Sequence, residues 1–394
     1  MTQPSTGPSE VQLLRTGAEF FPALLNAIEG AQREVHLETY IFSFEGAGLA
    51  VAQALLRAAE RGVDVRLVVD GAGTGELPAP WAQHFAQAGV HCHVYDPLSF
   101  LGLWQLRYWR RLHRKLCVVD ERLAFCGGIN LLDDYHDDKV KGRLPAPRLD
   151  YAVRVSGQLV PVIHDAMRRL WGRLEAMAEL RSRDMRRAFD ALRELDLDPE
   201  PSRRGPVQLV LRDNVRHRSR IERTYRKAIG SARQDILIAC AFFFPGNRLR
   251  RALMLAARRG VRVRLLLQGH YEYFFPYHAA RHLYGHLLAA GVEIYEYHAS
   301  FLHAKVAVID GHWATVGSSN LDPLSLLLAR EANIVVRDAA FAHTLADSLQ
   351  QAMAQGATAV DPQAYANRPW WQRSVDALGY WLLRFGVFLT GKHY

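Results

Sequence analysis

Residues 112–120 read LHRKLCVVD, and residues 302–310 read LHAKVAVID. Both stretches contain a histidine, a lysine two positions further on, and an aspartate at the end of a short apolar run. On a β-strand, side chains two positions apart point to the same face. Each stretch therefore predicts a strand that presents an imidazole and an ammonium group on one surface. The recurrence predicts that the chain consists of two related halves.

Other stretches recur in the same order in both halves. The recurring pairs are EVQLL (10–14) and PVQLV (206–210), AAERGVDVRLVVDG (58–71) and AARRGVRVRLLLQG (256–269), and QAGVHCHVY (87–95) and AAGVEIYEY (289–297). Because the order is kept along the chain, we predict a duplicated fold.

The apolar patterns within each half favour a layered α/β fold. The run LAVAQALLRAAERG (49–62) has helical apolar spacing and ends at Gly62, which is typical of a helix C-cap. The runs VRLVVDG and KLCVVD are short and almost continuously apolar. Such strands are usually covered by helices on both faces. Each half is predicted to run strand, helix, strand, helix, strand and then the motif strand.

Two segments differ in composition from the repeated units. A highly charged stretch follows the first unit and is expected to form a surface helix and a linker. Aromatic and basic residues alternate at the C-terminus. We predict a first unit over residues 8–170, the charged helix and linker over 171–205, a second unit over 206–360, and a C-terminal membrane-surface segment over 361–394.

The composition indicates a globular protein with an anionic partner. The chain has 394 residues, 49% apolar and 23% charged, with a net charge of +9. The positive charge suits nucleic acid, an acidic membrane or a phosphorylated substrate. The four cysteines form no C-x-x-C pair and are expected to be core residues. Without a signal-peptide pattern or a long uncharged apolar run, we expect a protein that could lie on a membrane but does not cross one.

Each motif is followed by an asparagine in a glycine-containing turn. GGIN ends at Asn130 and GSSN ends at Asn320, at the same distance from the motif histidine. A hairpin would return each asparagine beside the imidazole and the ammonium group. Lysine and amide donors suit a phosphate, and imidazole can act as a nucleophile or a proton donor.

Two such half-sites facing each other predict an in-line displacement at a phosphodiester. One histidine would attack phosphorus, the other would protonate the leaving oxygen, and the lysines would neutralise the phosphate oxygens in place of metal ions. A single copy of the motif could arise by chance, and a strand histidine is often structural. Two copies, each with its asparagine, favour a functional site.

The paired motif resembles that of the phospholipase D superfamily. Over roughly residues 10–390 the chain is similar to bacterial cardiolipin synthases of the short type, which lack N-terminal transmembrane helices. The most specific stretches are RRLHRK, AFCGGIN, HWATVGSSNLDPLSL and RPWW. The resemblance implies a duplicated phospholipase D-type α/β/α sandwich, with two units related by a pseudo-two-fold axis and the active site at their interface.

The resemblance also implies a reaction. In a cardiolipin synthase, phosphatidyl transfer between two phosphatidylglycerol molecules gives cardiolipin and glycerol, through a covalent phosphatidyl-histidine intermediate and without a metal or other cofactor. The implied partners are phosphatidylglycerol, other anionic phospholipids and the membrane surface, with no nucleic acid. The implied location is peripheral, on the cytoplasmic face of the bacterial inner membrane. The oligomeric state stays open.

Individual residues take roles from the same resemblance. Glu331 is expected to hold the histidine of its own motif, His303, and Asp150 lies on the corresponding strand of the first half. Such carboxylates fix the imidazole tautomer. Gly128 stands where the second motif has Ser318, so the half-sites are not equivalent. The implied catalytic residues are His113, Lys115, Asp120, His303, Lys305 and Asp310, and the implied phosphate-contacting residues are Asn130, Ser318 and Asn320.

Two aromatic and basic segments suit a membrane surface. Residues 96–111, DPLSFLGLWQLRYWRR, form an insertion before the first motif, and residues 368–394 alternate tryptophan and phenylalanine with arginine and lysine. Both have the composition of an interfacial element. A hairpin or helix packed on the protein itself is the alternative for each.

A helical histidine series allows a further interpretation. His278, His282 and His286 are four positions apart, a spacing that can present metal ligands on one face of a helix. No acidic or cysteine partner is apparent in the sequence, so structural roles are favoured.

Three other functions compete with phosphatidyl transfer. A nuclease or phosphodiesterase acting on nucleic acid fits the basic charge, but the aromatic segments lack a regular basic and aromatic pattern. A hydrolytic phospholipase D would differ only in how well water is excluded. A membrane-binding scaffold is disfavoured because both half-sites contain all their residues. For transfer, our hypothesis is that His113 attacks the donor phosphorus and His303 moves the protons, although the sequence leaves the two roles open.

Overall fold

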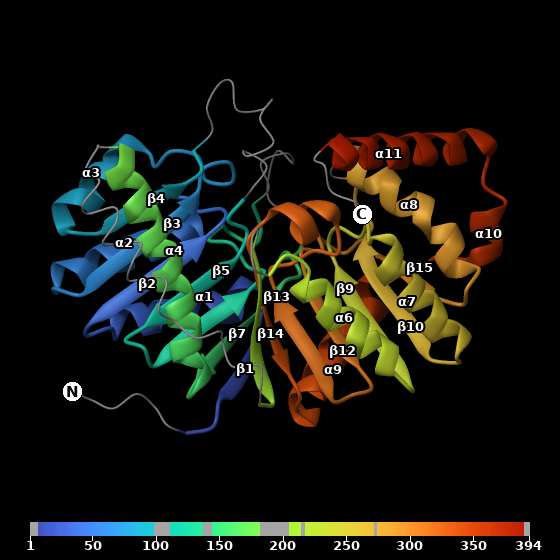
Figure 1. The fold of residues 1–394 in the computed structure, drawn as a ribbon, viewed down its shortest axis with the longest axis horizontal. Coiled ribbons are helices and arrows are strands. Elements are labelled where there is room, and N and C mark those ends of the chain that lie inside the picture. The colour runs from blue at the N-terminus through green and yellow to red at the C-terminus, as the bar shows by residue number, and fades with distance from the viewer. Residues whose placement is uncertain are drawn as a thin grey trace.

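The protein forms two α/β lobes that lie side by side (Figure 1). This computed structural model describes residues 7–97, 111–136, 144–181, 205–213, 217–271 and 274–389. The N-terminal part of the chain builds a lobe around a seven-stranded sheet, and the C-terminal part builds a lobe around an eight-stranded sheet.

The first sheet has the strand order β1-β7-β6-β5-β2-β3-β4. Strands β2, β3 and β4 are parallel, and the remaining neighbours pair antiparallel. The strands are β1 (Glu10–Arg15), β2 (Glu34–Thr39), β3 (Asp64–Asp70), β4 (His91–Tyr95), β5 (Lys115–Val119), β6 (Leu123–Gly127) and β7 (Tyr151–Ser156). The helices are α1 (Thr16–Glu29), α2 (Gly46–Glu60), α3 (Ala79–Ala88) and α4 (Leu159–Arg181).

The second sheet has the order β8-β14-β13-β12-β9-β10-β11, with β15 added beside β11. Its strands are β8 (Val207–Arg212), β9 (Asp235–Cys240), β10 (Arg262–Gln268), β11 (Glu293–Tyr297), β12 (Lys305–Ile309), β13 (Trp313–Gly317), β14 (Glu331–Val336) and β15 (Ala357–Ala359). The helices are α6 (Arg220–Ser231), α7 (Asn247–Arg258), α8 (Phe274–Leu288), the π-helical turn η3 (Leu324–Leu328), α9 (Ala339–Gly356), α10 (Pro362–Ala366) and α11 (Trp370–Leu389).

The two sheets share one topology. Strands β1 to β7 and β8 to β14 take the same places in their sheets, so the predicted duplication is confirmed. Before the motif strand, each half contains one helix and one strand more than predicted, α3 with β4 in the first half and α8 with β11 in the second. The added strands coincide with the recurring stretches HCHVY and EIYEY.

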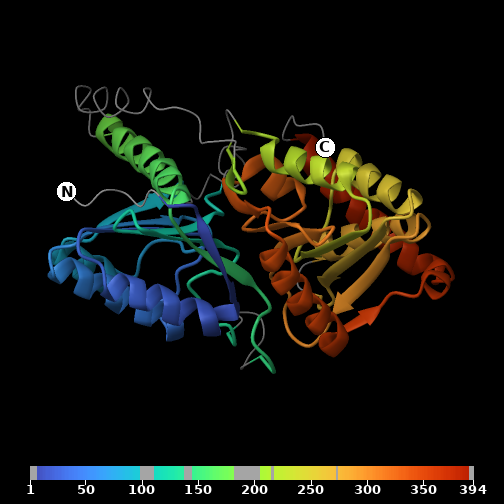
Figure 2. The same cartoon turned by 90° about the horizontal axis from the view of Figure 1, so that it is seen from below.

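Helices cover both faces of each sheet (Figure 2). On β2, Val35 and Leu37 pack with α1 and α2, whereas His36 lies against Trp171 of α4. On β9, Ile236 packs with α6 and α7, and Leu237 packs with α9. This alternation follows from the two-residue period of a strand, and the α/β/α layering predicted from the apolar strands is confirmed.

A hydrophobic cluster crosses the boundary between the lobes. Leu116 and Val118 of β5 belong to the same cluster as Val306 and Val308 of β12. The motif strands are therefore fixed relative to each other by a shared core. Helix α4 continues to Arg181, past the boundary predicted at residue 170. Most of the predicted linker, residues 182–204, lies outside the described residues.

Candidate active site at the boundary of the two lobes

The motif histidines precede β5 and β12 and are held by the backbone of the opposite lobe. The N–H of His113 donates to the carbonyl oxygen of Arg330 at 3.0 Å, and the N–H of His303 donates to that of Leu149 at 2.9 Å. Neighbouring residues form an isolated parallel bridge at each crossing. Each lobe thus aligns its histidine with the segment that leads to the acidic residue of the other lobe.

The side chains pair across the boundary as well. His113 Nδ1 lies 3.0 Å from Glu331 Oε1, and His303 Nδ1 lies 2.6 Å from Asp150 Oδ2. The expectation that Glu331 holds the histidine of its own motif is therefore wrong, because Glu331 contacts His113. Within a lobe, one strand separates the motif strand from the strand of the acidic residue. Two strand spacings amount to about 10 Å, too far for a hydrogen bond.

Asp150 and Glu331 occupy equivalent places. Gly127 pairs with Ala152 in the first sheet, and Gly317 pairs with Asn333 in the second, which puts each acid two residues before its paired position. This register agrees with the correspondence expected from the sequence. The two imidazoles are therefore held by chemically similar but unequal carboxylates.

Both motif lysines are buried beside the histidines. Lys115 Nζ donates to the carbonyl oxygen of His113 at 2.7 Å, and Lys305 Nζ donates to that of His303. Burial lowers the pKa of Lys305 and lowers that of Lys115 to about 7, with the charge of Lys305 adding to the effect at Lys115. An anionic phosphate placed between the lysines would oppose both effects.

The pair formed by His113 and Glu331 favours an ionised carboxylate. Burial raises the pKa of Glu331, but the charges of His113 and Lys115 and a hydrogen bond from Ser318 outweigh burial, so this pKa is lowered. Burial lowers the pKa of His113, against the opposing effect of Glu331. A neutral His113 then donates from Nδ1 to Glu331 and keeps the lone pair of Nε2.

In the pair formed by His303 and Asp150, the carboxylate binds a proton more readily than the imidazole does. Burial raises the pKa of Asp150 to about 6. Burial and the charges of Lys305 and Arg148 lower the pKa of His303 well below its usual range. When Asp150 is protonated, it donates to Nδ1 of His303, and the ring then carries its hydrogen on Nε2.

One substitution between the half-sites accounts for part of this difference. Ser318 Oγ donates to Glu331 Oε2 at 2.5 Å and accepts from the N–H of Ala332 at 3.1 Å. The fully buried Ser318 hydroxyl thus donates to Glu331, and phosphate contact by Ser318 stays a prediction. At the equivalent position, a Cβ on Gly128 would lie only 2.3 Å from Asp150 Oδ1. Asp150 therefore requires glycine there.

Asn130 and Asn320 are held in the same way. Asn130 Oδ1 accepts from the N–H of Ile41 at 3.3 Å, and Asn320 Oδ1 accepts from the N–H of Phe242 at 3.4 Å. The oxygens bind the chain, so the amide hydrogens are the groups that a phosphate could use. Phosphate contact by these two residues stays a prediction.

The motif aspartates lie at the other end of the motif strands. Asp120 accepts from the backbone N–H groups of residues 32–34, and Asp310 accepts from those of residues 233–235, at 2.8 to 3.0 Å. A five-residue strand of about 17 Å separates them from the histidine end. We therefore correct the expectation that Asp120 and Asp310 join the reacting groups, because they hold the loops that lead into β2 and β9.

Two residues of the site were missed by sequence reasoning. The ring centroid of Tyr40 lies 4.9 Å from that of His113, and Lys115 Nζ lies 5.2 Å from the Tyr40 centroid. Arg148 lowers the pKa of His303. Tyr40 directly follows β2, and the equivalent residue after β9 is Ala241. The sequence signal that could have identified Tyr40 is an aromatic residue that stands at this position in only one half.

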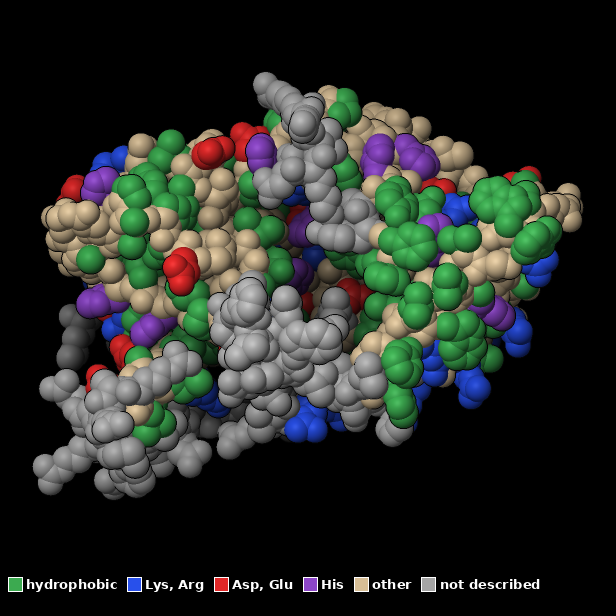
Figure 3. Space-filling view, turned by 90° about the horizontal axis from the view of Figure 1, so that it is seen from above, with side chains coloured by type: hydrophobic (Ala, Val, Ile, Leu, Met, Phe, Trp, Pro, Cys, Tyr) green, Lys and Arg blue, Asp and Glu red, His purple; other side chains and the backbone are tan. Residues whose placement is uncertain are grey.

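The site opens into a hollow between the lobes. Figure 3 shows histidine, basic and acidic side chains at the bottom of this hollow, beside apolar side chains. The side chains of His113 and His303 are 15% and 21% exposed, whereas those of their carboxylate partners are almost completely buried. A ligand in the hollow would therefore meet the imidazoles rather than the acids.

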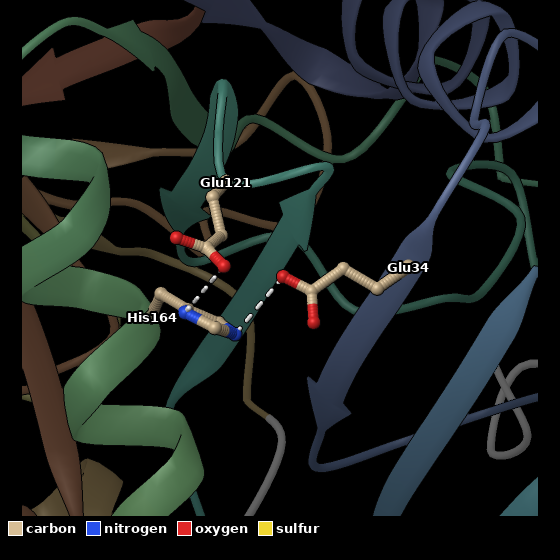
Figure 4. A group of neighbouring side chains, drawn as sticks. All are labelled: Glu34, Glu121 and His164. Atoms are coloured by element: carbon tan, nitrogen blue, oxygen red, sulfur yellow. Dashed lines mark ion pairs between the residues drawn. The ribbon is translucent and has the colours of Figure 1, made fainter. Parts of the chain in front are cut away.

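Another group of side chains has metal-ligand chemistry but lies outside this site. His164 of α4 places Nε2 3.0 Å from Glu34 Oε1 and Nδ1 4.0 Å from Glu121 Oε1 (Figure 4). The three offer ligand atoms within 4.8 Å of one another. Each ring nitrogen thus faces a different carboxylate, and the group links α4 to the first sheet.

The histidines of α8 contact α11. His278 Nδ1 lies 2.7 Å from Asp376 Oδ1, which is the acidic partner that the sequence did not reveal. The ring of His282 lies 4.4 Å from that of Tyr380. These contacts support the structural roles favoured for the series.

Two equivalent α/β lobes that bring paired histidine and lysine half-sites together define a phospholipase D-type enzyme. The family model described as "Cardiolipin synthase, PLD-like domain" matches residues 24–139 and 225–353. Cardiolipin synthase B of Salmonella typhi is 40% identical over 383 residues, which cover 97% of this chain and 90% of that protein, and the Escherichia coli (strain K12) protein of the same name is 39% identical with the same coverage. The chain belongs to the cardiolipin synthases, phosphatidyltransferases of the phospholipase D superfamily.

Solved structures show the same fold. Phosphatidylserine synthase of Haemophilus influenzae superposes with a TM-score of 0.70 at 12% identity, covering 95% of this chain and 93% of that chain. Polyphosphate kinase of Porphyromonas gingivalis gives a TM-score of 0.57 at 14% identity, covering 96% of this chain and 53% of that chain. At these identities the likeness concerns the fold alone.

Proposed function

We propose that this protein synthesises cardiolipin by transferring a phosphatidyl group from one phosphatidylglycerol to another. The observation that carries the proposal is the pair of histidines, each bound to a buried carboxylate of the other lobe and flanked by a buried lysine. The names of the relatives, which match almost the whole chain, support phospholipid as the substrate class.

The first step forms a covalent intermediate on His113. Its Nε2 lone pair attacks the phosphorus of the donor, and the bond from phosphorus to the glycerol oxygen breaks. His303 delivers its Nε2 proton to that oxygen, and glycerol leaves. The ionised Glu331 supports this role of His113, because it accepts the Nδ1 hydrogen and leaves Nε2 nucleophilic.

The second step transfers the phosphatidyl group. A hydroxyl of the second phosphatidylglycerol gives its proton to His303 and attacks phosphorus, and the bond from phosphorus to nitrogen breaks to restore His113. Asp150 supports the proton-transfer role of His303, because their atoms are 2.6 Å apart and the pKa of Asp150 is raised to about 6 by burial. A bound phosphodiester adds negative charge and increases the proton affinity of this pair.

The lysines stabilise the charge that builds up on the phosphate oxygens. Lys115 and Lys305 are 5% and 1% exposed, so they act in a site of low dielectric constant. Their own burial is costly without an anion, and a substrate phosphate supplies the missing charge. This arrangement needs only side chains of the chain itself.

We also propose that α11 lies on the membrane surface. One face of α11 packs on α8 through Asp376 and Tyr380. The other face exposes 45 to 77% of each of several large side chains, namely Trp370, Trp371, Leu378, Trp381, Leu382, Phe385 and Phe388. Apolar side chains gather over α8 and α11 on the face of the molecule that contains the hollow (Figure 3). Docking on the protein and contact with lipid therefore use different faces of one helix.

The described part of the chain contains no helix that is both long and apolar enough to cross a membrane. The other segment expected at the membrane, residues 96–111, lies mostly outside the described residues. A peripheral position on the cytoplasmic face of the inner membrane stays part of the proposal.

The test uses purified protein on phosphatidylglycerol vesicles with EDTA present, read by mass spectrometry. We expect cardiolipin and glycerol from the wild-type protein, and a loss of at least about a thousandfold in the variants His113→Ala and His303→Ala. Phosphatidic acid without cardiolipin would make the protein a hydrolase. Lack of any lipid turnover would direct attention to nucleic acid.

A further inference from the structure

The two half-sites differ at one position behind the motif histidines. Asp70 ends β3 and Gln268 ends β10, and the strand registers make these residues equivalent. Each accepts from the backbone N–H of the residue just before the motif histidine: Asp70 Oδ2 from Leu112 at 2.7 Å, and Gln268 Oε1 from Leu302 at 3.3 Å. The supporting role is shared, but glutamine adds an NH₂ group that aspartate lacks.

The NH₂ group of Gln268 is buried, and no residue that the structure describes accepts a hydrogen bond from it. By contrast, Gln268 Oε1 accepts from the backbone N–H groups of both Leu302 and His270. In the first half, both oxygens of Asp70 are engaged by backbone N–H groups. Burying a donor without an acceptor is unfavourable, so Gln268 Nε2 is expected to bind a partner that the described residues do not supply.

Gln268 lines a small, partly open pocket of about 30 Å³ beside the second half-site. Phe242 and Tyr277 are among its aromatic walls, and none of the lining residues that the structure describes is acidic. The pocket adjoins the site through its backbone, since the N–H of Phe242 donates to Asn320 and the N–H of Ala241 donates to the carbonyl oxygen of Ala304, the residue after His303. A group in this pocket would lie on the His303 side of the reacting phosphorus.

We propose that this pocket receives the glycerol headgroup and that Gln268 Nε2 donates a hydrogen bond to one of its hydroxyl oxygens. The inference rests on the proposed function, in which His303 first protonates the leaving glycerol and then deprotonates the acceptor glycerol. The leaving glycerol and the acceptor glycerol must therefore bind at the same place beside His303. The aromatic walls suit the C–H faces of a polyol. A hydrogen-bond donor with no acidic side chain among the described lining residues disfavours an ammonium headgroup.

The test separates binding of the alcohol from cleavage of the donor. Phosphatidyl-p-nitrophenol serves as the donor, because its leaving group is not glycerol, and free glycerol serves as the acceptor in competition with water. Release of p-nitrophenol measures the first step. The ratio of phosphatidylglycerol to phosphatidic acid measures selection of glycerol over water.

Gln268→Glu is the informative variant. Its carboxylate keeps an oxygen that accepts from Leu302 but removes the N–H donors. We expect the ratio of phosphatidylglycerol to phosphatidic acid to fall about tenfold, the effect of one hydrogen bond of about 1.4 kcal/mol. The exposed Gln351 of α9 provides the control, because Gln351→Glu makes the same change of charge on the surface and should match the wild-type ratio.

A second variant distinguishes alcohol binding from support of the backbone. Gln268→Met removes both the donor and the oxygen that accepts from Leu302. If Gln268→Met is defective while Gln268→Glu keeps the wild-type ratio, Gln268 acts only as a support and the inference fails. A wild-type protein that releases p-nitrophenol but forms only phosphatidic acid at high glycerol would overturn the proposed transferase function together with the subsite. Thermal melts of all variants report folding.

Discussion

Ser318 and Gly128 occupy one position in the two half-sites, and this difference contributes to their unequal chemistry. The Ser318 hydroxyl donates to Glu331 and helps to keep that carboxylate ionised. Gly128 offers no donor to Asp150, whose pKa is raised to about 6 by burial. A nucleophilic imidazole needs an ionised acceptor on Nδ1, and a proton-transferring imidazole needs a partner that can hold a proton. The residues therefore suit the roles assigned to His113 and His303.

Replacing Ser318 tests this assignment through pH. In the variant Ser318→Ala, Glu331 loses a hydrogen bond that lowers its pKa, so that pKa rises. A carboxylate with a lowered pKa is ionised above that pKa and loses its charge as the pH falls through it. The acidic limb of the kcat profile should therefore move to higher pH, with kcat at neutral pH about tenfold lower.

The matched control is Ser319→Ala. Ser319 is buried next to Ser318, but its hydroxyl donates to the carbonyl oxygen of Asn320 rather than to a carboxylate. The acidic limb of the kcat profile of Ser319→Ala should coincide with that of the wild type. An acidic limb that does not move in Ser318→Ala would show that Ser318 does not affect the protonation of His113, the proposed nucleophile.

Among the elements, strands position the reacting groups, and one helix, α11, is proposed to contact lipid. Strands β5 and β12 place the imidazole and ammonium groups at one end and the aspartates at the other, where Asp120 and Asp310 hold the preceding loops. The separation follows from the length of an extended strand. Helix α11 has no reacting group, but its exposed aromatic face is far more apolar than a solvent-exposed helix requires.

The lipid-facing role of α11 is tested by the double variant Trp381→Glu with Phe385→Glu. These side chains are 62% and 59% exposed, so the change should leave the fold intact. Loss of their burial in lipid should weaken binding to phosphatidylglycerol vesicles at least tenfold in a sedimentation assay. Leu255→Glu, on the 47% exposed Leu255 of α7, is the matched control and should bind as the wild type does. Equal binding of all three proteins would exclude α11 as the membrane contact.

At the scale of the whole molecule, each lobe completes the site of the other. The N–H of His113 donates to Arg330 and the N–H of His303 donates to Leu149, so backbone contacts cross the boundary twice. The carboxylates follow the same crossing. A duplicated chain thereby makes one site from two halves, because the motif histidine of each lobe is paired with a carboxylate of the other lobe.

The pairing of each histidine with a carboxylate of the other lobe leads to a prediction for the covalent intermediate. In Glu331→Gln, labelling of the protein by a phosphatidyl donor should fall at least tenfold, because His113 Nδ1 keeps an oxygen acceptor but loses its anionic one. In Asp150→Asn, the labelled protein should accumulate, as in His303→Ala, because His303 loses the carboxylate that supports it as the base for the acceptor hydroxyl. Rapid quenching followed by intact-protein mass spectrometry measures both. The opposite pattern, with label lost in Asp150→Asn and trapped in Glu331→Gln, would assign the nucleophile to His303.

The sequence by itself determined the duplication, the layered α/β class and the residue types of the half-sites, because strand periodicity and recurring stretches are local properties of the chain. It also indicated that Asp150 and Glu331 take corresponding places. The tertiary structure alone decided which carboxylate serves which histidine, since that depends on how the two lobes face each other. It likewise decided that Ser318 serves Glu331 and that Asp120 and Asp310 support loops. Spacing along a chain defines which side chains share a strand face, but only the packing of two sheets against a common core defines what those faces meet.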